Sequence, residues 1–431
     1  MAPQGIALAD YGRLICRNRN FRLLWSAQIV SELGDWFYSV AIYSFLLQIA
    51  GTAQSVALAF MLQVLPQFFA APTAGVINDR ISRKKAMIFA DWMRAGIVLA
   101  MVLVRSRDMV WLLYLLLFCE TIMWALFEPA RSAVVPNIAA GADRVVANAL
   151  SSTTWSFNFA IGSALGGFVA AMYGRDAVFI LNSLSFVLSA ILISRMRFEE
   201  PHAAGRLPLC MRDLFDYKPM AEGVRYVSRD ARLMATMLVK AGLALMGANW
   251  VIIPIMGERL FPVHIEGFRG AQAATMGMSI LLASRGVGAI VGAFASTSLV
   301  GASSLRQRMG ILFGFVAGGL GYLLLAQTST IWWACAALVV AHAGGSVVWV
   351  ASTTLLQDQT HDAFRGRVFS AEFAFTTLTL AASSQAAGLA MDHGAGVRAV
   401  AFATGLAVLA PAVAWAYAQR LWSSPPRTRR A

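Results

Sequence analysis

The sequence predicts an all-α membrane protein with twelve transmembrane helices in two pseudo-symmetric six-helix bundles. Of the 431 residues, 58% are hydrophobic and only 13% are charged, and the mean hydropathy is +0.64. Soluble globular proteins carry about a quarter charged residues. The composition therefore excludes a soluble enzyme, a disordered chain and a secreted disulfide scaffold. The four cysteines lack the paired spacing of a metal or redox site, and we expect neither a metal nor a cofactor.

Apolar segments long enough to cross a bilayer recur along the whole chain. A helix needs about 20 mostly apolar residues to span the hydrocarbon core. The expected spans are 23–50, 53–77, 85–104, 109–135, 147–173, 176–194, 234–258, 275–300, 309–327, 330–356, 368–391 and 397–420. The first span is too long for the apolar region of a signal peptide, so we expect it to remain in the mature protein.

The longest polar stretch separates six spans from six. The expected organisation is a cytoplasmic N-terminus at 1–22, an N-terminal bundle at 23–194, a linker at 195–233, a C-terminal bundle at 234–420 and a cytoplasmic tail at 421–431. The two halves show a weak internal sequence similarity, in which Gly167 and Gly388 lie at equivalent positions, 221 residues apart. Duplicated halves are typical of transporter architectures.

The basic net charge of +13 follows from membrane topology. With the N-terminus placed inside, 26 of the 35 Lys and Arg residues fall in inside segments and 6 in outside loops. The positive-inside rule then places both termini in the cytoplasm, as expected for a bacterial-type inner membrane. Some attraction to anionic headgroups would follow, whereas no nucleic-acid partner is expected.

The first span carries a polar stripe formed by Gln28, Glu32, Asp35 and Ser39, at helical spacings of 4, 3 and 4 residues. A charge at the centre of a membrane helix costs about 2.5–3.5 kcal/mol on insertion scales. Two carboxyls on one stripe therefore indicate a water-filled cavity, where they could take up and release protons. The alternative is a buried acid that pairs with a basic residue on a neighbouring helix.

Four further intramembrane residues are candidates for the pathway of protons or substrate. Glu120 lies near the middle of the fourth span with Trp124 one turn beyond, an arrangement that suits an amphipathic cation, although Trp124 could equally face lipid. Arg285 in the eighth span could neutralise an anionic substrate or pair with an intramembrane acid. His342 in the tenth span could carry protons or be a neutral histidine that is hydrogen-bonded in the bundle.

Two other charged residues, Lys240 and Glu372, lie close to the ends of their expected spans. Long charged side chains at such positions commonly extend to the membrane surface. We therefore expect both residues to reach the interface rather than to line a site.

The loop between the second and third spans has the sequence Gly75-Val-Ile-Asn-Asp79-Arg80-Ile-Ser-Arg83-Lys84-Lys85. It resembles the signature of the major facilitator superfamily, with Ser82 where that family usually has a second glycine. The resemblance implies a cytoplasmic gate in which Asp79 pairs with a nearby arginine and faces the N-terminal end of the eleventh span. The expected gate residues are Gly75, Asp79, Arg80, Arg83, Lys84 and Arg131.

The fifth span contains Gly162-Ser163-Ala164-Leu165-Gly166-Gly167, which resembles the glycine-rich antiporter motif of drug exporters in that superfamily. Ser163 replaces the usual proline. Gly288 and Gly292 repeat the four-residue glycine spacing in the eighth span. The resemblance implies that the fifth and eighth helices meet between the two halves, so we expect a sliding contact there, with static packing as the alternative.

Three more stretches resemble the bacterial drug:proton antiporter group, which includes macrolide and siderophore exporters. They are Asn20–Trp25 leading to Gly34-Asp35, Phe127–Arg131 with Val135-Pro136, and Thr354–Gln357 followed by Arg365–Val368. With the other motifs, the resemblance covers about residues 20 to 390. It implies a monomeric secondary transporter that exports a hydrophobic or amphipathic small molecule by alternating access, with protons as the coupling ion.

Asp35 is the first candidate for proton coupling, followed by Glu32 and Glu120. The chain has no Gly-x-x-x-x-Gly-Lys-Ser/Thr loop, so direct use of ATP is not expected. A membrane-embedded enzyme would need a catalytic cluster such as His-Glu-x-x-His, which the sequence lacks. Two alternatives remain open: a lipid or lysolipid flippase of the same fold, and a non-transporting membrane sensor or scaffold.

Overall fold

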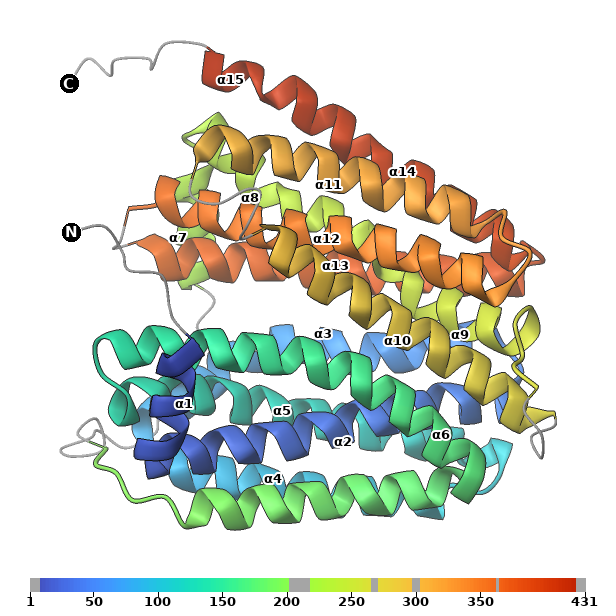
Figure 1. The fold of residues 1–431 in the computed structure, drawn as a ribbon, viewed down its shortest axis with the longest axis horizontal. Coiled ribbons are helices and arrows are strands. Elements are labelled where there is room, and N and C mark those ends of the chain that lie inside the picture. The colour runs from blue at the N-terminus through green and yellow to red at the C-terminus, as the bar shows by residue number, and fades with distance from the viewer. Residues whose placement is uncertain (1–7, 201–217, 265–269, 297–302, 362–363, 424–431) are drawn as a thin grey trace. The chain divides into compact units, whose positions relative to one another are not determined.

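Long α-helices joined by short connections make up most of the computed structural model, which describes residues 8–200, 218–264, 270–296, 303–361 and 364–423 (Figure 1). The helices before the linker are α1 (Leu8–Arg17), α2 (Arg19–Ala50), α3 (Ala53–Arg80), α4 (Arg83–Ala100), α5 (Val110–Ile138) and α6 (Ala142–Ser194). Those after it are α7 (Lys218–Val227), α8 (Ala231–Leu243), α9 (Asn249–Arg259), α10 (Ala271–Ala295), α11 (Ser304–Leu325), α12 (Ile331–Gln359), α13 (Arg365–Asp392), α14 (Val397–Ala418) and α15 (Arg420–Ser423). Short 3₁₀ segments are η1 (Met101–Leu103), η2 (Arg107–Met109) and η5 (Ala244–Ala248).

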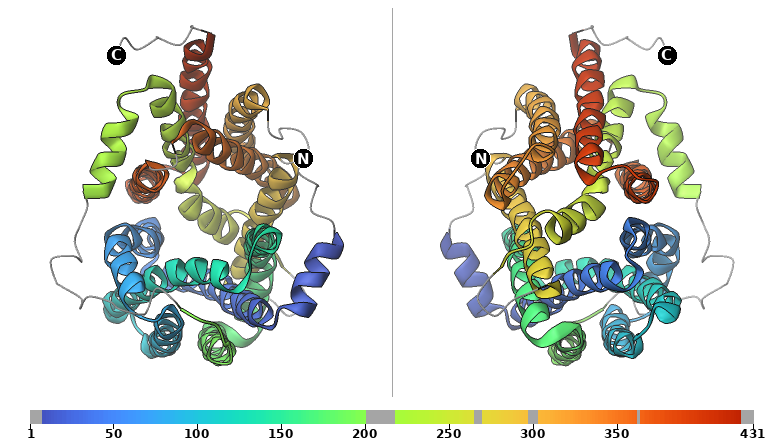
Figure 2. Two further views of the ribbon diagram at one scale, coloured as in Figure 1. Left: turned by 90° about the vertical axis from the view of Figure 1, so that its left-hand side faces the viewer. Right: turned by 90° about the vertical axis from the view of Figure 1, so that its right-hand side faces the viewer.

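The backbone contacts group the chain into two compact units. The first unit consists of Met1–Gly51, Leu62–Asp216 and Gly257–Ala283, and the second of Thr52–Met61, Tyr217–Met256 and Ser284–Ala431. The first turns of α3 thus belong to the second unit, and the first half of α10 belongs to the first unit. Within the first unit, α2, α4, α5 and α6 run side by side, as the end-on views show (Figure 2).

Nine helical segments among the described residues are long and apolar enough to cross a membrane. One of them, Val146–Ser194, is 49 residues long and includes both the fifth and the sixth expected span. Gly174 separates these two, because its φ of 80° and ψ of 168° break the helix without a loop. Polar residues such as Glu32 and Asp35 in α2, and Glu372 in α13, lower the hydropathy of these two long helices, which are not among the nine.

Glycines bring α6 into close contact with α2 in the first unit. A Cβ at Gly162 would lie 2.6 Å from the Cβ of Trp36, and one at Gly166 would lie 2.5 Å from the Cα of Phe37. Both distances are too short for any larger side chain, so α2 and α6 pack backbone to backbone here. Farther along α6, the carboxamide of Asn182 fills the space beside Gly34.

The fifth and eighth expected spans do meet, because the hydroxyl of Ser279 in α10 donates a hydrogen bond of 2.6 Å to the carbonyl of Ser163 in α6, but four of the five glycines lie outside this contact. In α10, Gly288 faces the backbone of Val339 and Gly292 faces that of Ala343, and both partners belong to α12. Gly162 and Gly166 face α2 instead. Of the five glycines, Gly167 alone faces α10, where it meets Ser279. Small residues at four-residue spacing therefore serve mainly packing between neighbouring helices within one unit.

The second unit has a similar glycine-rich centre in α11. A Cβ at Gly314 would lie 2.6 Å from the carbonyl oxygen of Gly344 in α12. On another face of α11, a Cβ at Gly319 would lie 3.0 Å from the carbonyl oxygen of Gly405 in α14. Because α11 approaches both neighbours this closely, α11, α12 and α14 form one tightly packed layer (Figure 1).

The seventh expected span is interrupted near its middle. The 3₁₀ segment η5 separates α8 from α9 and packs against α13. The hydroxyl of Ser383 donates a hydrogen bond of 2.9 Å to the carbonyl of Ala244, and Asn249 donates through its side chain to the carbonyl of Met246 at 2.5 Å. Side chains thus satisfy two carbonyl groups at the irregular turn, which is a requirement for irregular backbone inside a membrane protein.

We expect Gly166→Ala to lower the thermal stability of the protein, because the new Cβ would collide with the backbone of Phe37. Overpacking of a filled interior costs about 1–3 kcal/mol. The measurement is thermal unfolding of the purified protein in detergent. Gly96→Ala is the matched control, since Gly96 is also helical but has open space around it. Equal melting temperatures for Gly166→Ala and Gly96→Ala would show that the contact between α2 and α6 is less tight than described.

Candidate transport site

A buried arginine lies at the centre of the first unit. Arg94 of α4 is 1% exposed, and its guanidinium contacts carboxylates from three helices. The distances are 2.7 Å to Asp35 of α2, 2.9 Å to Glu120 of α5 and 3.7 Å to Asp91 of α4 itself. We call these four residues the Arg94 cluster. A buried charge is tolerated only when it is paired, and here one cation is shared by three acids.

Neighbouring side chains make hydrogen bonds and a ring contact with members of the Arg94 cluster. The Tyr38 hydroxyl donates a hydrogen bond of 3.2 Å to Glu120, and the Ser189 hydroxyl donates one of 2.6 Å to Asp91. The guanidinium carbon of Arg94 lies 3.9 Å from the centre of the Phe186 ring. Residues of α2, α4, α5 and α6 therefore all contribute, and the cluster holds these four helices in a fixed arrangement.

Asp35 is the most accessible member of the cluster. Its side chain is 22% exposed, compared with 6% for Glu120, 2% for Arg94 and 0% for Asp91. Its Oδ2 accepts the hydrogen bond from Arg94, whereas Oδ1 has no hydrogen-bond partner among the described residues. Asp35 is therefore the member of the cluster with the largest exposed fraction, although its unpaired Oδ1 is itself buried.

Glu32 belongs to a second polar network. It accepts hydrogen bonds from the Gln28 amide at 2.9 Å and from the Asn158 amide at 3.1 Å. The oxygen of Gln28 accepts a hydrogen bond of 3.1 Å from Arg131, which pairs with Glu128 at the end of α5. The expected polar stripe is thus present on α2, but its two acids, Glu32 and Asp35, contact different partners.

The second unit contains the other two pathway candidates. The guanidinium of Arg285 in α10 lies 4.2 Å from the ring centre of Trp250, and the opposing Phe60 ring stacks on Trp250 at 4.8 Å. His342 in α12 is 8% exposed and lies 3.1 Å from the hydroxyl of Tyr322. Arg285 thus has an aromatic partner, and His342 is hydrogen-bonded within the bundle.

Lys240 and Glu372 do not reach the membrane surface, so the expectation for them is wrong. Lys240 is 5% exposed and Glu372 is 3% exposed, and their charged groups lie 2.9 Å apart. The Lys240 ammonium also lies 4.4 Å from the Trp349 ring centre. Lys240 lies in the last turn of α8, but the candidate span runs from Ala231 to Arg259, so Lys240 lies well inside the span rather than near its end.

The short loop before α4 is anchored by its polar residues. Ser82 is the N-cap of α4 and accepts a hydrogen bond from the Lys85 amide at 3.2 Å. Arg83 donates to the carbonyl of Ala133 at 3.0 Å, and Lys84 donates to that of Met196 at 2.6 Å. The hydroxyl of Ser82 explains how a residue other than glycine is accommodated here.

The remaining expected site residues are Gly75, Asp79, Arg80 and Trp124. The surroundings of Gly75 and the side chain of Asp79 lie outside the described part of the structure. Arg80 and Trp124 are both partly buried, on α3 and α5 respectively. The contact of Asp79 with Arg80, Arg83 or Arg131 therefore stays a prediction, although Arg131 is already engaged by Glu128.

Sequence reasoning missed the cation of the cluster. It considered Arg285 as an intramembrane cation but assigned no role to Arg94, which is the more buried of the two. A usable signal was present: Asp91 and Arg94 are three residues apart within one apolar segment, which places them on the same helix face. Two opposite charges inside a membrane helix are rare and usually mark a site.

A helical bundle with nine candidate spans among the described residues and an ionic cluster inside it indicates a multi-pass membrane protein with a polar site within the bundle. The chain belongs to the transmembrane secretion effector family of the major facilitator superfamily, whose model matches residues 15–424. It is a multi-pass membrane protein of the efflux branch of that superfamily.

Individual relatives agree with this family. The chain is 26% identical to YfiS, an uncharacterized MFS-type transporter of Bacillus subtilis (strain 168), over 85% of each chain. It is 26% identical to macrolide efflux protein A of Streptococcus pyogenes, over 58% of this chain and 60% of that protein. The fold is similar to the crystal structure of a peptide transporter POT in complex with alafosfalin, with a TM-score of 0.74, 12% identity and coverage of 94% and 95%.

We expect Arg94→Gln to destabilise the protein strongly, because Asp35, Glu120 and Asp91 would remain buried without a cation. Removal of one partner from a buried pair costs about 3–5 kcal/mol. Thermal unfolding in detergent is the measurement. The exposed Arg105, which pairs with Asp176 at 2.6 Å, gives the matched control Arg105→Gln, whose stability should change little. Adding Asp35→Asn and Glu120→Gln to Arg94→Gln should restore stability; no restoration would contradict the shared pairing.

We also expect Lys240→Met to lower stability, whereas Lys240→Met combined with Glu372→Leu should recover most of the loss. The reason is that the single variant leaves a buried carboxylate unpaired, while the double variant replaces the pair by apolar side chains. Thermal unfolding distinguishes the two. Arg367→Met removes an exposed partner of Glu222, 3.1 Å away, and serves as the control. A single variant as stable as the control would mean that the pair is solvated.

Proposed function

We propose that this protein exports a hydrophobic or amphipathic small molecule in exchange for protons, by alternating access. The observation that carries the proposal is the Arg94 cluster, in which one guanidinium serves three buried carboxylates. Because one cation balances only one carboxylate, the cluster has acids left over that can bind and release protons. Intramembrane acids of this kind commonly form proton relays in transporters.

Asp35 is the acid to which we assign the main proton-carrying role. It is the most exposed member of the cluster, and its bond to Arg94 links its charge to the helices around it. Loss or gain of a proton at Asp35 would therefore change the interaction that holds α2 against α4. Glu32 has a modulating role in this proposal, because amides of Gln28 and Asn158 already stabilise its position.

The proposed topology has twelve spans with both termini in the cytoplasm. The nine apolar segments, α2, α13 and the second half of α6 together supply this number. The distribution of Lys and Arg supports the orientation. Asp79 would act at the cytoplasmic gate, and the transporter would function as a monomer.

The efflux direction is supported by the family and by the similarity to macrolide efflux protein A. The aromatic residues near the polar sites favour an apolar or amphipathic substrate. In the second unit, the buried Trp250 ring contacts both Phe60 and the guanidinium of Arg285, so aromatic and cationic groups already lie together there.

The same fold could instead move a lipid or lysolipid, or act as a sensor without transport. Flux of a fluorescent lysolipid through the reconstituted protein, with no flux of drug-like compounds, would favour the first alternative. A deletion strain with unchanged sensitivity to drug-like and siderophore-like compounds, and a reconstituted protein without any flux, would favour the second.

We expect Asp35→Asn to abolish uphill transport driven by a pH gradient, because asparagine imitates the protonated state permanently. Substrate binding should be retained. The measurement is substrate flux into proteoliposomes with an imposed pH gradient, together with downhill exchange without a gradient. Glu32→Gln should reduce the driven flux less than Asp35→Asn.

Asp176→Asn is the matched control for this experiment, because Asp176 pairs with the exposed Arg105 away from the cluster. Its driven flux should equal that of the unmodified protein. Full gradient-driven flux in Asp35→Asn would refute the assignment of Asp35 and leave Glu120 as the next candidate. Loss of both driven flux and downhill exchange would indicate a structural role instead.

A further inference from the structure

The first helix has a buried apolar face and an exposed basic face. Leu14 is 2% exposed and belongs to the core of the first unit, and Tyr11 and Ile15 pack against the same core. Arg13 and Arg17, one turn apart, are exposed on the other face. The helix lies across the end of the bundle where α2 begins, rather than along the spans (Figure 1).

The elbow between α1 and α2 is held by hydrogen bonds to other helices. Asn18 is the N-cap of α2 and donates through its side chain to the carbonyl of Ile138 at 2.6 Å. Asn20 donates to the carbonyl of Arg197 at 2.7 Å and accepts from its amide at 2.9 Å. Arg22 donates to the carbonyl of Ile15 at 2.9 Å, which closes the end of α1. The position of α1 is therefore defined by the fold.

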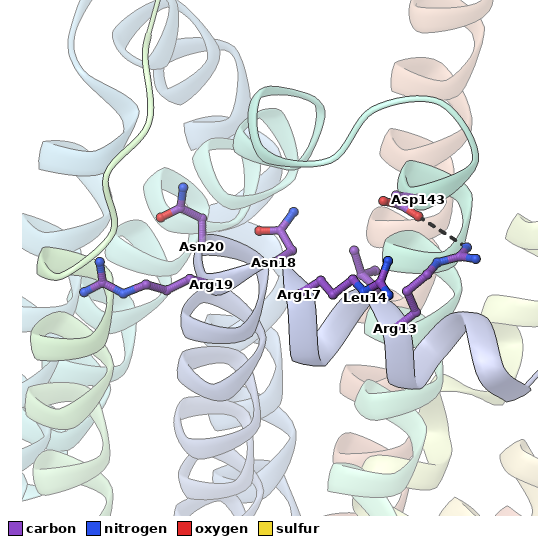
Figure 3. A pocket seen from close by; sticks show the side chains of 7 residues that line it. All are labelled: Arg13, Leu14, Arg17, Asn18, Arg19, Asn20 and Asp143. Carbon is purple, nitrogen blue, oxygen red and sulfur yellow. Dashed lines mark ion pairs between the residues drawn. The ribbon is translucent and has the colours of Figure 1, made fainter.

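This arrangement creates a cavity of about 600 Å³ on the exposed side of the elbow. Figure 3 shows its lining: Arg13, Leu14, Arg17, Asn18, Arg19, Asn20 and Asp143. Arg13 is already paired with Asp10 at 2.9 Å and lies 3.8 Å from Asp143. In the part of the chain that the structure describes, no carboxylate lies within 4.0 Å of the guanidinium of Arg17 or Arg19.

We propose that this cavity binds the phosphate of an anionic phospholipid headgroup. The cavity lies beside the first turn of α2, where a membrane helix leaves the hydrocarbon core, and it is therefore at the depth of the headgroups. Arg17 supplies a guanidinium group, which matches the geometry of phosphate oxygens, on the side of Arg13 and Asp143, whereas Arg19 extends toward the opposite end of the cavity and lengthens its basic lining (Figure 3). Three arginines against one aspartate give the cavity a positive charge.

A lipid fits these features better than a soluble phosphate compound does. Basic residues on an amphipathic helix at the membrane surface are the usual determinants of attraction to anionic lipids. The bilayer supplies headgroups at high local concentration at this depth. A dilute soluble phosphate compound would be held less well, because the cavity is open and does not enclose its ligand. The lipid would fix α1 against the end of α2, the helix that carries Asp35 and Glu32.

The test uses the full-length protein, purified in an uncharged detergent and titrated with dioctanoyl phosphatidylglycerol while its melting temperature is recorded. Parallel titrations use dioctanoyl phosphatidylcholine and inorganic phosphate. The variant is Arg17→Gln with Arg19→Gln. The matched control is Arg225→Gln with Arg229→Gln, which removes two exposed arginines four residues apart at α7.

We expect phosphatidylglycerol to raise the melting temperature of the unmodified protein and of the control, and phosphatidylcholine to raise it less. The half-saturating concentration of phosphatidylglycerol should be roughly 20-fold higher for the Arg17/Arg19 variant, since each basic residue at a membrane surface contributes about a fivefold factor. If the double variant does not fold, Arg17→Gln alone should give about a fivefold increase.

Three results would overturn the proposal. Equal weakening in the variant and the control would show a general charge effect rather than a site. Stabilisation by inorganic phosphate equal to that by phosphatidylglycerol would show a soluble anion site. An unchanged half-saturating concentration in the Arg17/Arg19 variant would show that the cavity does not bind the headgroup.

Discussion

The burial of the Arg94 guanidinium is the constraint on which the first unit depends. A charged group of this size is expensive to remove from water, and its cost is offset only if carboxylates surround it with good geometry. Asp35, Glu120 and Asp91 come from α2, α5 and α4, and Ser189 of α6 orients one of them. Four helices are therefore linked through one guanidinium, so a change at any one of these acids would alter the contacts of the others.

The buried charged groups of the two units are paired in different ways. The Arg94 cluster has more acids than cations, whereas Lys240 and Glu372 in the second unit form a balanced pair beside an aromatic ring. The guanidinium of Arg285 lies against the indole of Trp250. Surplus acid is thus concentrated in the first unit, and this asymmetry places the proposed proton chemistry there, leaving aromatic and cationic surfaces in the second unit for other contacts.

The sequence predicted the helices well because apolar length and polar stripes are local properties. The sequence could not predict which residues contact one another, because periodicity shows which residues share a face of a helix but not which helix packs against that face. Asp35 and Glu120 were identified, yet Arg94, which joins them, was not assigned a role. Lys240 was misplaced for a related reason: the apolar core of its span begins later than the helix, which starts at Ala231. The glycines of α6 and α10 were read as one contact, although most of them serve neighbours within their own unit.

The second unit combines closely packed regular helices with one interrupted span at η5, whose Gly247 itself lies close to the backbone of Leu380 in α13. Glycines join α11 to α12 and α14 at backbone distance, and such packing resists change because no side chain can move aside. In η5 the helix is already interrupted, and the hydroxyl of Ser383 satisfies the carbonyl of Ala244. A change in that bond costs less than breaking a regular helical turn, because a 3₁₀ turn is less stable than the α-helix on either side. A change of direction at η5 would also alter contacts with the layer formed by α11, α12 and α14, because a Cβ at Gly242 of α8 would lie only 2.9 Å from Pro411 of α14 and the Lys240 ammonium lies 4.4 Å from the Trp349 ring of α12.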